Sequence, residues 1–303
     1  MNEFIKITNI QRFCSDDGPG IRTTVFLTGC NMHCAWCHNP ENLKEGLIAF
    51  DAAKCEKCGQ CVKVCKMSAH SIKNGHHMFD RTKCVQCFAC VENCPSKSLY
   101  SGSYNILIDD LVDILSQDYD FYELSRGGIT LSGGEPIIQR QRVETLIGKL
   151  KKKKINIAVE TALNYKFDNL SSLLEAVDLF IVDLKAVSKD LHQKYTGVGN
   201  ELILDNIIRL SDIKKIWVRI PVIPEINVSL SEIRKMGDFL KNIKAEKVEL
   251  IPYHKMGISK YNIYGMEYKL KEVKTPTKDY IKAMIEILSK YGLPVEDMLN
   301  EYA

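Results

Sequence analysis

The sequence predicts an α/β fold in which a parallel sheet is interrupted by a cysteine-rich insertion. Six short apolar segments have the character of buried strands, and each apart from the last is followed by a segment with helical periodicity. Such βα repetition implies parallel strands joined by right-handed crossovers. Eleven of the twelve cysteines lie between Cys30 and Cys94, inside the first of these βα units. Six units are too few for a closed eight-stranded barrel.

The expected elements can be given by residue number. The strands begin near Thr23, Ile129, Ile155, Leu179, Ile216 and Val248, and cover residues 23–27, 129–131, 155–160, 179–184, 216–223 and 248–252. Helices are expected over residues 105–117, 139–152, 170–176, 202–210, 230–243 and 277–291, and the last of these is expected to end the chain.

Composition excludes several classes of protein. The chain has 303 residues, 45% of them hydrophobic, which is enough for one or two domains with a large core. Its 41 basic and 38 acidic residues are nearly balanced, so neither nucleic acid nor an anionic membrane is an expected partner. With no apparent signal peptide or apolar run of about 18 residues, we expect a cytoplasmic protein. The cysteines are then expected to bind metal, with Cys14 a packed thiol.

Three cysteines form an incomplete ligand set directly after the first strand. Cys30, Cys34 and Cys37 have the spacing C-x3-C-x2-C, with no fourth cysteine nearby. Catalytic metal sites leave a coordination position open, so this triplet is expected to be catalytic. The alternative is a zinc site completed by His33 or His38.

The other cysteines form two runs of the pattern C-x2-C-x2-C-x3-C, and every cysteine of the second run follows its counterpart in the first by the same offset. This pattern resembles bacterial two-cluster ferredoxins, in which the fourth cysteine of each run binds the other run's cluster. The resemblance implies two 4Fe–4S clusters in a ferredoxin-like insertion over residues 48–102, which divides a main domain of residues 1–47 and 103–303. The ligand sets would be Cys55, Cys58, Cys61 and Cys94 for one cluster, and Cys84, Cys87, Cys90 and Cys65 for the other. Lys66 replaces the usual proline after Cys65, and His70, His76 and His77 are expected in exposed loops.

Polar residues follow several of the predicted strands. They are the turn Gly133-Gly134-Glu135, the pair Glu160-Thr161, the residues Asp183 and Lys185, and His254, while Arg219 lies within a strand. Because ligand-binding groups gather at the carboxyl ends of parallel strands, these residues are expected to share one site with the cysteine triplet. The paired glycines are expected to let backbone approach a ligand closely.

The motif around the triplet resembles a known family. Trp36 precedes the last cysteine, Gly18-Pro19-Gly20-Ile21-Arg22 comes before the triplet, and His38-Asn39-Pro40 comes after it. This string is similar to the signature of glycyl-radical enzyme activating enzymes, which are radical S-adenosylmethionine (SAM) enzymes. The resemblance implies an open, partial (β/α)6 barrel. It also implies a 4Fe–4S cluster on Cys30, Cys34 and Cys37 with one iron open to SAM.

The resemblance also implies roles for the other site residues. Gly133, Gly134 and Glu135 would hold the amino group of SAM, and Lys185 its carboxylate. Asp183, Glu160 and Thr161 would hold a monovalent cation, although Glu160 stands where the family usually has Asp. Asn39, Arg219 and His254 would contact SAM, and Trp36 would either stack on the adenine or pack in the core.

The implied activity is modification of a protein. Reductive cleavage of SAM would give a 5'-deoxyadenosyl radical that removes a Cα hydrogen from a glycine of a partner enzyme. An external flavodoxin or ferredoxin would supply the electron. The two insertion clusters would relay it, serve as structural elements or shape the docking surface. The alternatives are a radical SAM enzyme with a small-molecule substrate and a ferredoxin-type electron carrier.

Overall fold

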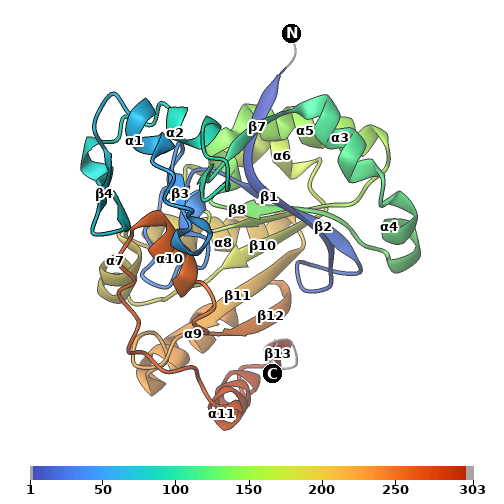
Figure 1. The fold of residues 1–303 in the computed structure, drawn as a ribbon. Coiled ribbons are helices and arrows are strands. Elements are labelled where there is room, and N and C mark those ends of the chain that lie inside the picture. The colour runs from blue at the N-terminus through green and yellow to red at the C-terminus, as the bar shows by residue number, and fades with distance from the viewer. Residues whose placement is uncertain (1–2, 298–303) are drawn as a thin grey trace.

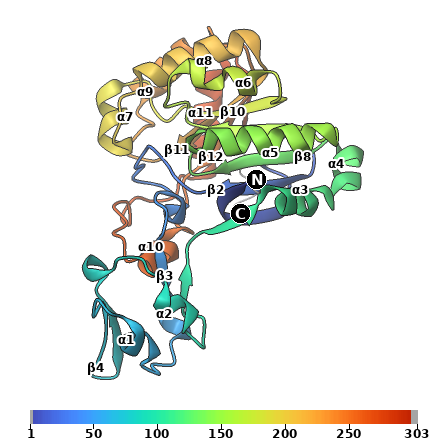
Figure 2. The same ribbon diagram turned by 90° about the horizontal axis from the view of Figure 1, so that it is seen from above.

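The computed structural model describes residues 3–297, which form a large mixed sheet, flanking helices and a small projecting module (Figures 1 and 2). The sheet has nine strands in the order β13-β12-β11-β10-β9-β8-β2-β1-β7. Its six central strands are parallel: β2 (Arg22–Leu27), β8 (Gly128–Gly133), β9 (Ile157–Thr161), β10 (Leu179–Asp183), β11 (Ile216–Val222) and β12 (Ala245–Pro252). The six predicted strands and their parallel arrangement are therefore confirmed.

Three strands of the large sheet were not predicted. The edge strands are β7 (Tyr104–Leu107) and β13 (Val295–Asp297). Strand β1 (Phe4–Cys14) lies between β7 and β2. Strands β1 and β7 are antiparallel to their neighbours, whereas β13 is parallel to β12. The prediction of a helix over residues 105–117 was wrong for residues 105–107, because these belong to β7. The helix expected to end the chain is α11 (Lys278–Ser289), and β13 follows it.

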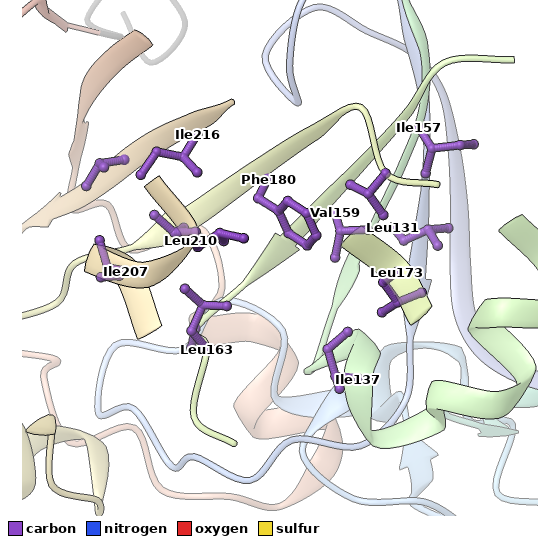
Figure 3. Packing of buried hydrophobic residues seen from close by; sticks show 14 of the residues in the cluster. Leu131, Ile137, Ile157, Val159, Leu163, Leu173, Phe180, Ile207, Leu210 and Ile216 are labelled. Carbon is purple, nitrogen blue, oxygen red and sulfur yellow. The ribbon is translucent and has the colours of Figure 1, made fainter. Parts of the chain in front are cut away.

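Helices cover the sheet and bury its apolar residues. They are α3 (Ile108–Ser116), α4 (Tyr119–Ser125), α5 (Arg140–Lys152), α6 (Ser171–Leu174), α7 (Lys189–Thr196), α8 (Glu201–Ile213), α9 (Leu230–Leu240) and α11. Helix α10 (Ile258–Tyr264) instead packs beside the segment that follows the cysteine triplet. Figure 3 shows Phe180 of β10 between residues of the neighbouring strands and of α8. Strands buried on both faces are continuously apolar, which is why residues 179–182 gave a clear strand prediction.

Residues 48–102 form the module that projects from the sheet beside α10 (Figure 2). It contains two antiparallel pairs, β3 (Ile48–Phe50) with β6 (Leu99–Ser101) and β4 (His70–Lys73) with β5 (His76–Phe79). The helices α1 (Gln60–Val64) and α2 (Ala89–Glu92) carry cysteines. The expectation that its histidines occupy exposed loops was wrong, because all three lie in β4 or β5 and His70, stacked on Phe79, is only 3% exposed.

Within the described residues, no helix combines the length and the apolar character needed to cross a membrane.

Candidate active site at the carboxyl ends of the strands

A cavity of about 280 Å³ lies at the carboxyl ends of the parallel strands. Of the predicted site residues, it is lined by Cys30, Cys34, Trp36, Cys37, Asn39, Gly133, Gly134, Glu135, Glu160, Thr161, Asp183, Lys185 and Arg219. These side chains come from distant parts of the sequence and meet because parallel strands end at one edge of the sheet. His254 is not among the lining residues, although its neighbour Tyr253 is.

The three cysteines of the triplet are held on the loop that follows β2. Burial raises the pKa of the Cys30 thiol to about 11 and that of Cys37 to about 12. The nearby Lys185 ammonium acts in the opposite direction on Cys30 and Cys34. Buried thiols become ligands only as thiolates, so a metal centre with its own positive charge suits this triplet.

The alternative for the triplet is a zinc site, which requires ligand atoms close together. One zinc ion would hold three thiolates about 3.8 Å apart, from Zn–S bonds of about 2.3 Å in a tetrahedron. Among the described residues, only the group of Cys61, His70 and His77 brings three ligand atoms within 4.8 Å of one another, and the triplet is not part of it. His38, a suggested fourth zinc ligand, directs Nε2 at the carbonyl oxygen of His254 at 3.0 Å. These contacts therefore give no support to the zinc alternative.

Helix α10 fixes the far side of the cysteine loop. The Lys260 ammonium donates to Asn39 Oδ1 at 2.7 Å, and the Tyr261 hydroxyl donates to the Cys37 carbonyl at 2.8 Å. Trp36 is 9% exposed and packs in a cluster that includes Tyr261, so it is a packed aromatic that also lines the cavity. Sequence reasoning missed Lys260 and Tyr261, since they lie near the other end of the chain and nothing local relates them to the triplet.

The paired glycines bring the turn after β8 very close to the backbone of β2 and of the cysteine loop. A Cβ on Gly134 would lie 2.0 Å from the carbonyl oxygen of Gly29, and one on Gly133, whose φ is +107°, would lie 2.4 Å from the Leu27 nitrogen. The turn therefore needs glycine because it crosses the backbone of the cysteine loop. This close crossing fixes the loop against the end of β8.

Glu135 links the glycine turn to the end of β9. Its buried carboxylate accepts hydrogen bonds from Thr161 Oγ1 at 2.8 Å and from the Ala162 and Ile137 amides at 3.0 and 3.4 Å. Burial raises the pKa of Glu135 to about 7, even though these hydrogen bonds lower it. Glu135 thus has a positioning role that joins two strand ends.

This shifted pKa predicts a pH dependence of stability. The folded chain binds the Glu135 proton more tightly than the unfolded chain does, so protonation of this carboxyl stabilises the folded state. This stabilisation is complete below about pH 4.5 and is lost as the pH rises through about 7. The decline amounts to about 3 kcal/mol. In Glu135→Gln the fall in thermal unfolding midpoint across this window should become shallower, whereas Glu286→Gln, at an exposed position on α11, should leave it unchanged. Parallel curves for wild type and Glu135→Gln would contradict this interpretation.

Two further strands contribute buried ion pairs. Lys185 donates to Asp183 at 2.8 Å, and the charges of Asp183, Cys34 and Cys30 raise the pKa of this ammonium despite its burial. Arg219, which is 7% exposed, donates to Glu249 at 2.8 Å and to Glu160 at 2.7 Å.

The cavity therefore contains fixed cations beside the thiols. Burial disfavours the ionised form of Glu160, but the Arg219 charge outweighs it and lowers the pKa of this carboxyl. The second Glu160 oxygen accepts from the Ser132 hydroxyl. The ring of His254 packs against that of His38, with centroids 3.9 Å apart and planes tilted by 35°, and His38 lines the cavity.

Sequence comparison identifies the family. The profile of the radical SAM superfamily matches residues 24–240, most of the chain. This chain belongs to the radical SAM superfamily. A radical SAM methyltransferase from Sphaerobacter thermophilus has the same fold, with a TM-score of 0.54 and 14% identity over 96% of this chain and 76% of that one. The α/β radical SAM fold with a mixed sheet is therefore established.

Curated relatives narrow the radical SAM assignment. The choline trimethylamine-lyase activating enzyme of Oleidesulfovibrio alaskensis is 35% identical over 95% of this chain and 96% of the relative. The trans-4-hydroxy-L-proline dehydratase activating enzyme of Clostridioides difficile is 38% identical over 91% and 93%. The (2S)-3-sulfopropanediol dehydratase activating enzyme of Klebsiella oxytoca is 34% identical over 94% and 93%. The resemblance to activating enzymes of glycyl-radical enzymes is confirmed.

Proposed function

We propose that this radical SAM enzyme activates a glycyl-radical enzyme by removing a Cα hydrogen from one of its glycines. The observation that carries the proposal is the open cavity in which three thiols, two buried cations and the Gly133–Glu135 turn meet. When bound, a 4Fe–4S cluster and SAM supply the chemistry: one electron cleaves SAM reductively to a 5'-deoxyadenosyl radical. The chain contributes binding, orientation and exclusion of water.

The residues that would hold these groups follow from the lining of the cavity. We assign Cys30, Cys34 and Cys37 as cluster ligands, and Lys185 as the partner of the SAM carboxylate. The turn at Gly133, Gly134 and Glu135 offers backbone carbonyls to the SAM amino group. The rest of the SAM site is defined, directly or through neighbours, by Asn39, Trp36, Thr161, Arg219 and His254. We also propose that the six parallel strands form a partial (β/α)6 barrel, which leaves room for the glycine-bearing segment of the partner.

The monovalent cation is the part of the proposal that the contacts support least. Both oxygens of Glu160 already accept hydrogen bonds, from Ser132 and from Arg219. A cation at Glu160 would compete with the guanidinium, so a cation site would have to depend on Asp183 and Thr161.

The module over residues 48–102 is proposed to be a ferredoxin-like domain with two 4Fe–4S clusters. One small cavity is lined by Cys55, Cys58, Cys61 and Cys94, and another by Cys65, Cys84, Cys87 and Cys90. Each cavity therefore takes its fourth cysteine from the other run, as two-cluster ferredoxins do. A cytoplasmic location would suit both cavities, because reducing compartments keep thiols free of disulfides.

A double substitution tests whether the module relays electrons. Cys58 and Cys87 are exposed ligands, one in each proposed set. In Cys58→Ala with Cys87→Ala, activation driven by flavodoxin or ferredoxin should fall much more than SAM affinity, because the SAM cavity lies on the sheet. Rates of SAM cleavage with the protein donor and SAM dissociation constants would be compared. An equal loss of both properties would indicate a structural role instead.

The partner can be tested directly with the enzymes that the relatives activate. The reduced protein and SAM would be mixed anaerobically with choline trimethylamine-lyase, trans-4-hydroxy-L-proline dehydratase or (2S)-3-sulfopropanediol dehydratase. An organic radical signal that disappears when the partner's glycine is replaced by alanine supports the proposal. Formation of 5'-deoxyadenosine without a radical on any of these enzymes would favour a radical SAM enzyme with a small-molecule substrate. Absence of SAM cleavage would favour the alternative of a ferredoxin-type electron carrier.

A further inference from the structure

The module over residues 48–102 is built from two copies related by the repeat of the cysteine pattern. In the β3–β6 pair Phe50 lies opposite Leu99, and in the β4–β5 pair Phe79 lies opposite His70. Phe50 and Phe79 are separated along the chain by the same offset as the two cysteine runs, and so are His70 and Leu99. The pairing therefore follows the repeat, and every residue near one cysteine set has a defined counterpart near the other.

The two cavities differ in the side chains that face the thiols. Cys94 Sγ lies 3.3 Å from Ser98 Oγ and 3.7 Å from Ser96 Oγ. His77 lies between two further thiols, with Nε2 at 3.4 Å from Cys61 Sγ and Nδ1 at 3.7 Å from Cys55 Sγ. The tautomer of His77 protonated at Nδ1 directs its N–H at Cys55 Sγ, whereas Nε2 is shared between Cys61 Sγ and His70 Nδ1, which lies 3.0 Å away.

The counterparts of these donors in the other cavity cannot donate from their side chains. They are Ile48 for His77, Met67 for Ser96 and Ala69 for Ser98, each at the matching position of the preceding copy, and all three line the second cavity. Among the described contacts, the hydrogen bonds to thiols of the second set come from backbone amides: Ala69 to Cys65 at 3.3 Å and Gln86 to Cys84 at 3.4 Å. His70 also lines this cavity, but its Nδ1 faces His77 Nε2 at 3.0 Å.

We propose that the two clusters of the module have unequal reduction potentials. The cluster on Cys55, Cys58, Cys61 and Cys94 has the higher potential, because hydrogen bonds are donated to its thiolates by His77, Ser96 and Ser98. Hydrogen bonds to cluster sulfurs stabilise the additional negative charge of the reduced state. This cluster then accepts the first electron. The inference rests on the proposed function of the module as a two-cluster domain.

The test exchanges matched residues and measures midpoint potentials in the full holoenzyme. EPR-monitored redox titration would follow all three clusters, and the one whose spectrum changes with SAM is set aside as the active-site cluster. In the wild type the other two midpoints should differ. His77→Ile, which copies Ile48, should lower the higher midpoint by more than the scatter of replicate titrations, and Ala69→Ser, which copies Ser98, should raise the lower one.

His76→Ile is the matched control, because His76 is the exposed neighbour of His77 on the same strand. It should leave all midpoints unchanged. Equal midpoints in the wild type, or the same shift in His77→Ile and His76→Ile, would overturn the inference while leaving the two-cluster module intact. Iron analysis distinguishes failure of this inference from failure of the proposed two-cluster function of the module. About twelve iron per chain is expected for three clusters, whereas about four iron, or zinc bound at Cys61, His70 and His77, would refute the module's proposed function itself.

Discussion

Replacing Cys34 with alanine should abolish SAM cleavage and remove about four of the iron atoms expected per chain. Cys34 lines the cavity and is half-buried there, as one of the three thiols assigned to the cluster. Loss of one thiolate leaves the cluster with too few protein ligands to be retained. Iron and sulfide content after anaerobic purification, with 5'-deoxyadenosine formation in the presence of a chemical reductant, would measure both effects.

Cys14→Ala is the matched control for this prediction. Cys14 is a buried thiol that lies in β1, where its Sγ contacts the Gln11 carbonyl at 3.4 Å. This substitution should preserve iron content and SAM cleavage. If Cys34→Ala retained full iron content and activity, the assignment of the triplet would be wrong.

Replacing Arg219 with methionine should destabilise the fold by about 3–5 kcal/mol, because it leaves Glu160 buried without its cation and leaves Glu249 paired with Lys247 alone. The Arg219 charge also links strands β9, β11 and β12 at the edge that forms the cavity. SAM binding should therefore weaken strongly even at temperatures where the variant stays folded. Thermal unfolding midpoints and SAM affinities under anaerobic conditions would measure these two losses.

Arg209→Met provides the comparison, because Arg209 is an exposed arginine on α8 that faces Asp205 at 3.8 Å. Exposed pairs of this kind contribute about 0–1 kcal/mol. Unfolding midpoints that fell equally in Arg209→Met and Arg219→Met would show that the buried network has no special role. Glu160→Gln combined with Arg219→Met should recover part of the lost stability, since it removes the unpaired charge.

The central strands could be predicted from sequence because they are buried on both faces. Residues 179–182 are continuously apolar and fully or nearly fully buried, which identified β10 to within a residue. Strand β1 was missed, although Ile5 and Ile7 alternate with Lys6 and Thr8 in the period-2 pattern of a strand with one solvated face. That alternation was the available signal, and it was weaker than the continuous apolar runs.

The residues of the site were predictable where the chemistry constrains their spacing. The triplet Cys30, Cys34 and Cys37 is fixed by a local motif, and polar residues at strand ends meet because of topology. Partners that depend on tertiary contacts were not predictable. Arg22, for example, stood in a recognised string, but its full burial and its hydrogen bonds to Thr130 and the Ile129 carbonyl could not be read from sequence.

The histidines of the module illustrate the same limit. A histidine in a short linker between two cysteine runs gives no local indication that it will face a thiol. His77 reaches Cys61 only because β4 and β5 pair in register and turn its ring inward. The repeat of the cysteine pattern contained the missing information, since it aligns His77 with the buried Ile48.

The most direct test of the central claim is the response of the reduced, anaerobically purified protein to SAM. If Cys30, Cys34 and Cys37 hold a cluster with one open iron, SAM should change the EPR spectrum of one cluster only and be converted to methionine and 5'-deoxyadenosine. Zinc bound at these three thiolates, or a reduced protein whose spectrum is unaffected by SAM and which leaves SAM intact, would contradict the account.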